Sequence, residues 1–407
     1  MPSRFVSFWS VFSAAPHRLL FFGGAFQIIG VIGWWLPELA ARVTGHAWLP
    51  PAVLPVAWAH TFLMLYGVFP FFIFGFLFTV YPRWMGATVI PRRAYVAVAV
   101  LLYGGVLLFY TGLYLHPWVV ALALLLFGIG WGAALWSLYS VYRRARQRGT
   151  HERLLNLALA AGLFGIGSFL VATLSEQVFL FRLAREIGIW LFLLPVVFIV
   201  AHRMIPFFSQ STLMNYLMVR PAWGPPLMWI CAGGHMLLEL AGYPEWRFIA
   251  DLPLAIAALH HSWVWQFRRS FHARLLAMLH IAFLWLGLAM ALYALQSLTL
   301  LITGTDFFGR APLHALGIGF FTGMVVAMAS RVTLGHSGHA LNADTLTWAV
   351  LLGVNVSAAL RIAGELLPAA GATLNLAAGL VWLVSLGAWV VRYAPLYLQP
   401  RADRQPG

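Results

Sequence analysis

Residues 94–115 read AYVAVAVLLYGGVLLFYTGLYL, and residues 118–141 read WVVALALLLFGIGWGAALWSLYSV, with only His116 and Pro117 between them. Neither run contains an acidic or basic side chain. At about 1.5 Å of rise per residue, a helix of this length crosses a hydrocarbon core of about 30 Å. A cluster of five arginines follows at 143–153. The stretch therefore predicts two antiparallel membrane-spanning helices joined by a tight turn.

The remainder of the chain follows the same pattern. Of its 407 residues, 62% are hydrophobic and 9% are charged, a composition that a soluble core cannot absorb. Apolar runs bounded by Arg, Pro or Gly predict twelve spans, near 19–37, 58–81, 94–115, 118–141, 154–174, 186–205, 225–242, 247–266, 274–302, 312–330, 345–366 and 373–395. No stretch is left for a separate soluble domain, so we expect residues 1–407 to form a single all-α, polytopic membrane domain.

The formal net charge is +14, and all 25 basic residues are Arg. Under the predicted topology, nineteen of them lie on the side that also holds both chain ends. Basic residues accumulate in cytoplasmic loops, so we expect both termini to be cytoplasmic. We interpret the basic excess as a topology signal with membrane lipid as the partner, and not as a nucleic-acid-binding surface.

Three arginines at the ends of the second, sixth and tenth spans suggest an internal repeat. Each lies eight positions after a glycine or proline, in the pairs Gly75/Arg83, Pro195/Arg203 and Gly323/Arg331. The arginines are 120 and 128 residues apart, about four spans each, which suggests three tandem four-helix units. The alternative is that any span ending on the cytoplasmic side tends to end in arginine.

Two of the fourteen histidines lie at matching outer depth, His60 in the second span and His314 in the tenth. Ionisable groups are costly inside a membrane and mark candidate functional sites. Each of the two has a glycine on roughly its own helix face, Gly67 and Gly317. Two imidazoles at one level, with clearance for a flat ring, suit a haem with two axial histidines. The alternative is that the glycines only permit close helix packing.

A second outer group consists of His235 and Glu239, four residues apart in the seventh span, and Asp251 at the start of the eighth. A carboxylate can orient an imidazole beside a metal. The interpretation we prefer is that the carboxylate satisfies an isolated buried histidine.

A larger group of histidines lies toward the inner ends of the spans, comprising His202 beside Arg203, then His260, His261, His280, His336 and His339. Adjacent helical residues point about 100° apart, so of His260 and His261 we expect only one, His261, to share a site with the others. Gly335 and Gly338 favour a loop over a helix for the last two. Such a nitrogen-rich set without thiolate suits copper, iron, nickel or zinc. The single cysteine excludes a four-cysteine iron–sulfur cluster.

Arg331 ends the tenth span beside the polar segment 335–339. A guanidinium can hold a carboxylate in a bidentate fork, and a haem propionate or Asp344 is the expected partner. The alternative is that Arg331 is a simple positive anchor.

No phosphate-binding loop, dinucleotide fingerprint, G-x-S-x-G or H-E-x-x-H motif occurs, so nucleotide-dependent and hydrolytic functions have no support.

Several segments together resemble the NnrS family of haem- and copper-containing membrane proteins of denitrifying and related bacteria. The sequences HALGIG at 314–319 and RVTLGHSG at 331–338 are similar to the family's H-A-L-x-x-G and R-x-x-L-G-H-[ST]-G motifs. The sequence HRMIPFF at 202–208 resembles R-x-I-P-x-F, and His60 with MLYG at 64–67 fits the second span. PHRLLFF at 16–22 and RYAP at 392–395 also fit, so the likeness covers nearly the whole chain.

One departure from the family pattern concerns metal ligands. Many relatives carry H-x-H-E at the start of the second span, where this chain has Phe62 and Leu63 in place of the second His and Glu. The resemblance implies haem, with copper as a further metal, in a bacterial inner-membrane protein of the response to nitric oxide or nitrosative stress, linked to denitrification. The missing pair leaves copper binding open. The twelve helices in three units also resemble subunit I of haem–copper oxidases, by analogy of fold alone.

Two other classes of function stay open. A multi-pass transporter would use intramembrane His, Glu and Asp side chains as a substrate or proton path. An assembly or sensory membrane protein would need no such path. Whether the chain is an enzyme is not decided by its sequence.

Overall fold

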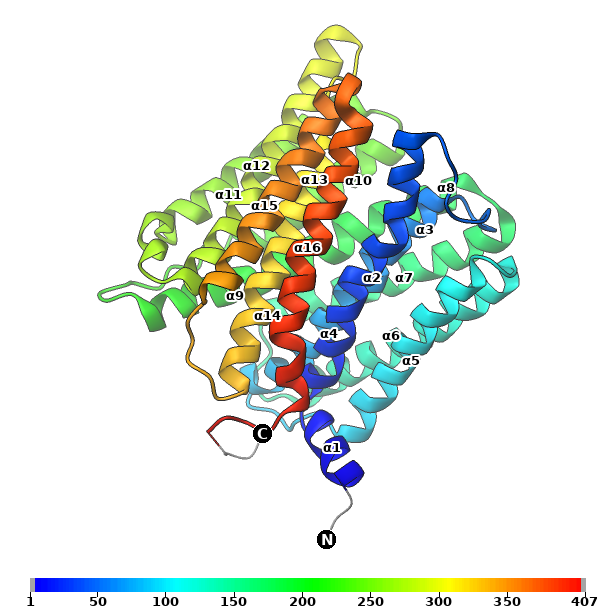
Figure 1. The fold of residues 1–407 in the computed structure, drawn as a ribbon. Coiled ribbons are helices and arrows are strands. Elements are labelled where there is room, and N and C mark those ends of the chain that lie inside the picture. Colours follow the sequence, from blue (N-terminus) through cyan, green and yellow to red (C-terminus); the bar gives the residue numbers. More distant parts are fainter. Residues whose placement is uncertain (1–3, 404–407) are drawn as a thin grey trace.

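The computed structural model describes residues 4–403, which are helical nearly throughout and contain no strand (Figure 1). Ten helices in this range are long and apolar enough to cross a membrane. The predicted spans near 225–242 and 247–266 also form helices, α10 and α11, of 17 residues each. The prediction of a polytopic helical bundle is therefore confirmed, and all twelve predicted spans correspond to helical segments.

The helices fall into three units of four after a short first helix, α1 (Arg4–Phe12). In each unit the second segment is one long helix with a π-helical part. The first unit comprises α2 (Pro16–Thr44), the long helix α3 (Val56–Phe62), η1 (Leu63–Val68) and α4 (Phe69–Trp84), then α5 (Arg92–Gly112) and α6 (Pro117–Arg144). The second comprises α7 (Thr150–Ser175), the long helix α8 (Val178–Glu186), η2 (Ile187–Leu193) and α9 (Leu194–Thr212), then α10 (Gly224–Leu240) and α11 (Phe248–Val264). The third comprises α12 (Arg274–Thr303), the long helix α13 (Ala311–His314), η5 (Ala315–Thr322) and α14 (Gly323–His336), then α15 (Thr345–Leu366) and α16 (Gly371–Leu398). Short 3₁₀ turns η3 (Pro244–Trp246), η4 (Phe267–His272) and η6 (Pro368–Ala370) lie in the connections.

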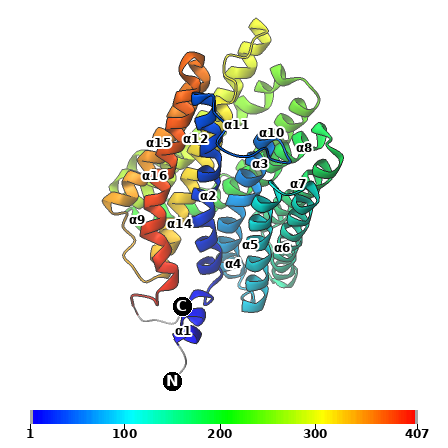
Figure 2. The same ribbon diagram turned by 45° about the vertical axis from the view of Figure 1, so that its right-hand side comes forward.

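The same contacts recur in each unit, which supports the predicted threefold repeat. The first helix packs against the second as α2 with α4, α7 with α9 and α12 with α14, and the third packs against the fourth as α5 with α6, α10 with α11 and α15 with α16. The fourth helix of each unit then contacts the first helix of the next, as α6 with α7, α11 with α12 and α16 with α2. The last of these pairs closes a ring. Figures 1 and 2 show α5 and α6 at one edge of this ring, with both chain ends at the same end of the bundle.

The second helix of each unit lies at the centre of the ring. In each of these three helices, 83% of the most apolar window is buried, against 28 to 67% in the other seven spans. Each contains its π-helical segment in its first half, and η1 contacts η2 while α4 contacts α14. A π-turn inserts one extra residue into a helix, rotates the side chains that follow, and is frequent at functional sites. The three central helices are therefore the place to look for chemistry.

Local sequence explains where the helices begin and end. Proline occupies the first turn of α2, α6 and α10, where its missing N–H costs no hydrogen bond. The side chains of His116 and Asp344 cap α6 and α15 by accepting a backbone N–H. α2 continues through Pro37 to Thr44, seven residues beyond the predicted end of the first span near residue 37.

Candidate functional site

The outer pair His60 and His314 lies on two of the three central helices, as predicted. His314 contacts the Arg361 guanidinium, and among the described residues no hydrogen bond or ring contact joins the two imidazoles. His60 stacks on Trp35 with ring centroids 4.2 Å apart, and its buried Nδ1 has no hydrogen-bond partner among the described residues. The structure therefore places the two histidines on two of the central helices, each with its own partner, and the pairing of the two stays a prediction.

His314 is held in one orientation by its own helix. Its Nδ1–H donates to the backbone carbonyl of Arg310 over 2.8 Å, which directs Nε2 away from the helix axis. The Arg361 guanidinium lies 3.0 Å from that Nε2 and also pairs with Glu365 at 3.2 Å. A Cβ on Gly317, one turn further on, would meet no atom within 4 Å. His314 Nε2 is thus in contact with Arg361, and the open space lies at Gly317 on the same helix.

Within the predicted inner group, the structure joins His202 and His261 and adds His151, which the sequence analysis missed. The imidazole of His202 accepts at Nδ1 from His151 Nε2 over 3.0 Å and donates from Nε2 to the Pro221 carbonyl over 3.0 Å. The ring centroids of His202 and His261 are 5.5 Å apart. His261 donates from Nδ1 to the Ala257 carbonyl, while its buried Nε2 has no partner in the described chain.

A glycine keeps that nitrogen open. A Cβ on Gly224 would lie 2.5 Å from His261 Nε2, so any larger residue would displace the imidazole. His260, the neighbour of His261, is exposed, which agrees with the expectation that only one of the two joins a site. Nothing in the sequence singles out His151, whose neighbour Glu152 pairs with Arg203 at 2.7 Å.

The other inner histidines are dispersed. His280 is buried and contacts the Ser209 hydroxyl over 3.1 Å. His336 ends α14 with its ring centroid 4.7 Å from that of His17, and His339 lies beyond the helix end, exposed, beside Ser337. Within residues 4–403, no three His, Cys, Asp or Glu side chains converge as a metal site. The inner group is therefore one cluster of His151, His202 and His261 with three separate histidines around it.

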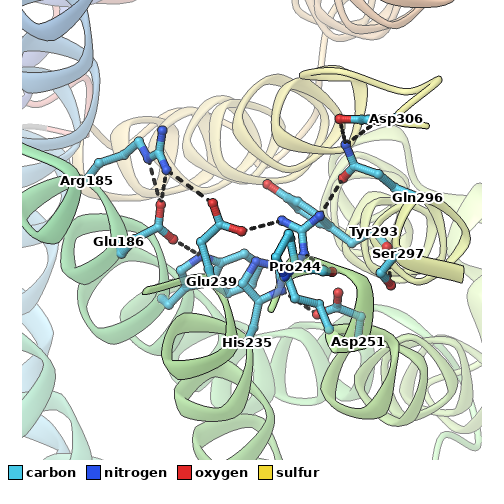
Figure 3. A network of polar contacts seen from close by, with 12 residues as sticks. Arg185, Glu186, His235, Glu239, Pro244, Asp251, Tyr293, Gln296, Ser297 and Asp306 are labelled. Atoms are coloured by element: carbon cyan, nitrogen blue, oxygen red, sulfur yellow. Dashed lines mark hydrogen bonds and ion pairs between the residues drawn. The ribbon is translucent and has the colours of Figure 1, made fainter. Parts of the chain in front are cut away.

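The outer group around His235 forms a polar network in a cavity of about 310 Å³ (Figure 3). His235 Nδ1 and Asp251 Oδ1 are 2.6 Å apart and both side chains are buried, so Asp251 and not Glu239 orients this imidazole. Glu239 instead pairs with Arg247 at 2.9 Å and with Arg185 at 3.6 Å. The ring of His235 stacks on Trp190, with centroids 3.7 Å apart.

The three arginines of the repeat have different surroundings. Arg203 pairs with Glu152, and Arg83 is exposed. Arg331 is buried, and its Cζ lies 4.0 Å from the centre of the Phe208 ring. Asp344, predicted as a partner for Arg331, instead pairs with Arg392 at 2.9 Å, so that part of the prediction is wrong.

Arg331 also cannot serve the same haem as His314. The two residues are 17 positions apart on one long helix, a distance of about 25 Å at about 1.5 Å per residue. The outer pair and Arg331 therefore belong to two different places in the molecule.

Comparison with known families gives one match, to the family described as NnrS protein, over residues 11–401. No curated protein matches the chain.

Proposed function

The chain belongs to the NnrS family, which is associated with responses to nitric oxide, and from this premise we propose that it binds haem between His60 and His314. We further propose that it is a multi-pass protein of a bacterial inner membrane with both termini in the cytoplasm, that it acts in the response to nitric oxide or nitrosative stress, and that this action is linked to denitrification. Membership of the family and the helical bundle support the membrane assignment.

The observation that carries the haem proposal is the state of the two imidazoles. His314 has its tautomer fixed by a backbone carbonyl, as an axial ligand requires, and His60 keeps a buried nitrogen without a partner. Gly317 leaves open space beside His314. Loading the site requires the Arg361 guanidinium to leave Nε2 of His314.

The positive charges around the two histidines suit haem, which carries two propionate carboxylates. The Arg361 guanidinium lies 3.0 Å from His314 Nε2, and Arg42 lies over the ring of Trp35 on which His60 stacks. A guanidinium that leaves His314 can hold a carboxylate in a bidentate fork. Bound haem, held by His60 and His314, would supply a redox-active iron, and nitric oxide could bind that iron only where one of the two histidines had left it.

Copper is proposed as a second metal, at the inner cluster. His261 Nε2 is buried and without a partner, and Gly224 leaves the space in front of it. His202 lies beside it, although both of its ring nitrogens are hydrogen-bonded. Imidazole nitrogens are suitable copper ligands.

Optical and elemental measurements on the purified protein test the haem proposal. We expect a haem absorption band and stoichiometric iron, and loss or conversion of the band in His60→Ala and in His314→Ala. His46→Ala is the matched control, because His46 is an exposed histidine expected on the same side. Unchanged haem content and spectrum in both ligand variants would refute the assignment.

The competing function is transport, and the polar cavity around His235 is the observation that favours it. Buried ionisable residues in a membrane protein often form a proton or substrate path. A colourless and metal-free preparation, together with proton or solute uptake into vesicles that is lost in Asp251→Asn, would favour transport over haem binding.

A further inference from the structure

Arg331 is a buried guanidinium without an acidic partner. Its side chain is 7% exposed, and it has no hydrogen bond or ion pair with any residue in 4–403. The guanidinium lies over the ring of Phe208, with Cζ 4.0 Å from the ring centre, and such a contact is much weaker than an ion pair in a buried place. Because removing a charge from water without a counter-charge costs several kcal/mol, an anion is expected beside Arg331.

Arg331 lines a cavity of about 630 Å³ at the ends of the central helices α4, α9 and α14, which we call the arginine chamber. Arg83, Arg401 and His336 line it as well, and none of its lining residues within 4–403 is an aspartate or glutamate. Arg401 has its own partner, Asp403, at 2.6 Å. The chamber is therefore basic, with Arg331 as its buried charge.

Most of the remaining wall is apolar. Phe76, Phe207 and Val332 belong to it, and Phe76 also lines a narrower apolar crevice that continues between the same three central helices. A small oxyanion would leave most of this apolar space unfilled. The chemistry of the chamber thus suits a ligand that carries an anionic group on an apolar body.

The location of the arginine chamber in the bundle indicates which class of molecule supplies this ligand. The chamber lies at the end of α14 beside Arg401, at the end of the bundle where both chain ends lie (Figure 1). Basic pockets between membrane helices at this depth recognise anionic lipid head groups, and a guanidinium fork matches a phosphate. Arg331 is about 25 Å along the helix from His314, so this ligand is separate from a haem held there.

We propose that the arginine chamber binds an anionic phospholipid, with Arg331 on the phosphate and the acyl part against Phe76, Phe207 and Val332. The inference does not depend on haem at His60 and His314. Losing a hydrogen bond to a charged group costs about 1.5–3 kcal/mol, which is about a tenfold or larger loss of affinity.

The test uses the full-length protein, purified in detergent and depleted of lipid. Dioleoyl-phosphatidylglycerol is added, with dioleoyl-phosphatidylcholine as the uncharged reference lipid, and binding is followed by native mass spectrometry and by the thermal unfolding midpoint. We expect phosphatidylglycerol to bind and stabilise the wild type, and Arg331→Gln to weaken its binding about tenfold or more. Arg144→Gln, the same change at an exposed arginine that ends α6, should bind like the wild type.

A second variant keeps the test decisive if Arg331→Gln does not fold. Ser211 is exposed and lines the chamber, so Ser211→Trp fills the space without removing a charge and should also block the lipid. Equal binding of the two lipids would overturn the proposal. So would equal stabilisation by inorganic phosphate, which would indicate a small oxyanion, or a tetrapyrrole that copurifies with the wild type and is lost in Arg331→Gln.

Discussion

The buried hydrogen bond between His235 and Asp251 yields the sharpest prediction about stability. The two groups are 2.6 Å apart, and their side chains are 2% and 0% exposed. The other carboxylate oxygen of Asp251 has no partner among the described residues, so His235 is the main support of this carboxyl group. Removing one member of such a pair leaves a buried polar or charged group alone, at a cost of about 3–5 kcal/mol.

We therefore expect Asp251→Leu and His235→Phe each to lower the free energy of unfolding by about 3–5 kcal/mol. Phe can keep the stacking of His235 on Trp190. The double variant should cost far less than the sum, because it leaves neither partner behind. The assay is reversible unfolding in mixed detergent micelles, completed as a double-mutant cycle.

The exposed pair of Arg42 and Glu38, with side chains 44% and 31% exposed, is the control for this cycle. Removing either partner there should change stability by less than about 1 kcal/mol. If the costs of Asp251→Leu and His235→Phe simply add, the two groups are not coupled and the reasoning fails.

Three further predictions concern packing, charge and topology. Gly105→Ala should destabilise the α5–α6 pair by about 1–3 kcal/mol in thermal unfolding, because its Cβ would lie 3.0 Å from the backbone of Phe127. Burial alone would raise the pKa of Asp344, but its hydrogen bonds with Thr347 and Arg392 lower this pKa to about 2. The stability that Asp344 contributes is therefore present above its unfolded pKa of 3.8 and should be lost as the pH falls from 3.8 toward about 2. A reporter that is active only in the cytoplasm should be active when fused at the C-terminus and inactive when fused after Pro50.

Each of these predictions has a control. Gly167→Ala, in a helix position where a Cβ meets nothing within 4 Å, should be neutral or stabilising, by up to about 1 kcal/mol. Asp344→Asn keeps a capping side chain but removes the charge, so its unfolding free energy should converge with that of the wild type at acid pH. A constant difference across the pH range would contradict the role of the charge, and reporter activity after Pro50 would reverse the orientation.

The positions of the spans could be read from the sequence because they follow from a local requirement. A helix in a bilayer needs about 20 consecutive apolar residues, and that condition is visible without any knowledge of neighbours. The regular spacing of Arg83, Arg203 and Arg331 along the chain likewise predicted the threefold repeat, because a repeat of four spans is visible in the sequence itself. The π-helical segments were not predicted, because they depend on how each central helix packs inside the ring.

Parts of the candidate sites could also be predicted. His60 and His314 were paired from their depth alone, since depth follows from the position within a span. His151 and His17 were missed because each lies at the start of a helix, where a histidine looks like an ordinary surface residue.

The sequence by itself determined that this is an all-helical membrane protein, where its helices run, and which residues are costly enough inside a bilayer to be candidates for function. Only the tertiary structure decided which candidates meet: Asp251 with His235 in place of Glu239, Arg392 with Asp344, and, within the described part of the chain, no carboxylate with Arg331. The physical reason is that hydropathy is a property of each segment alone. A hydrogen bond or an ion pair depends on how two distant helices are rotated against each other, and packing of the whole ring sets that rotation.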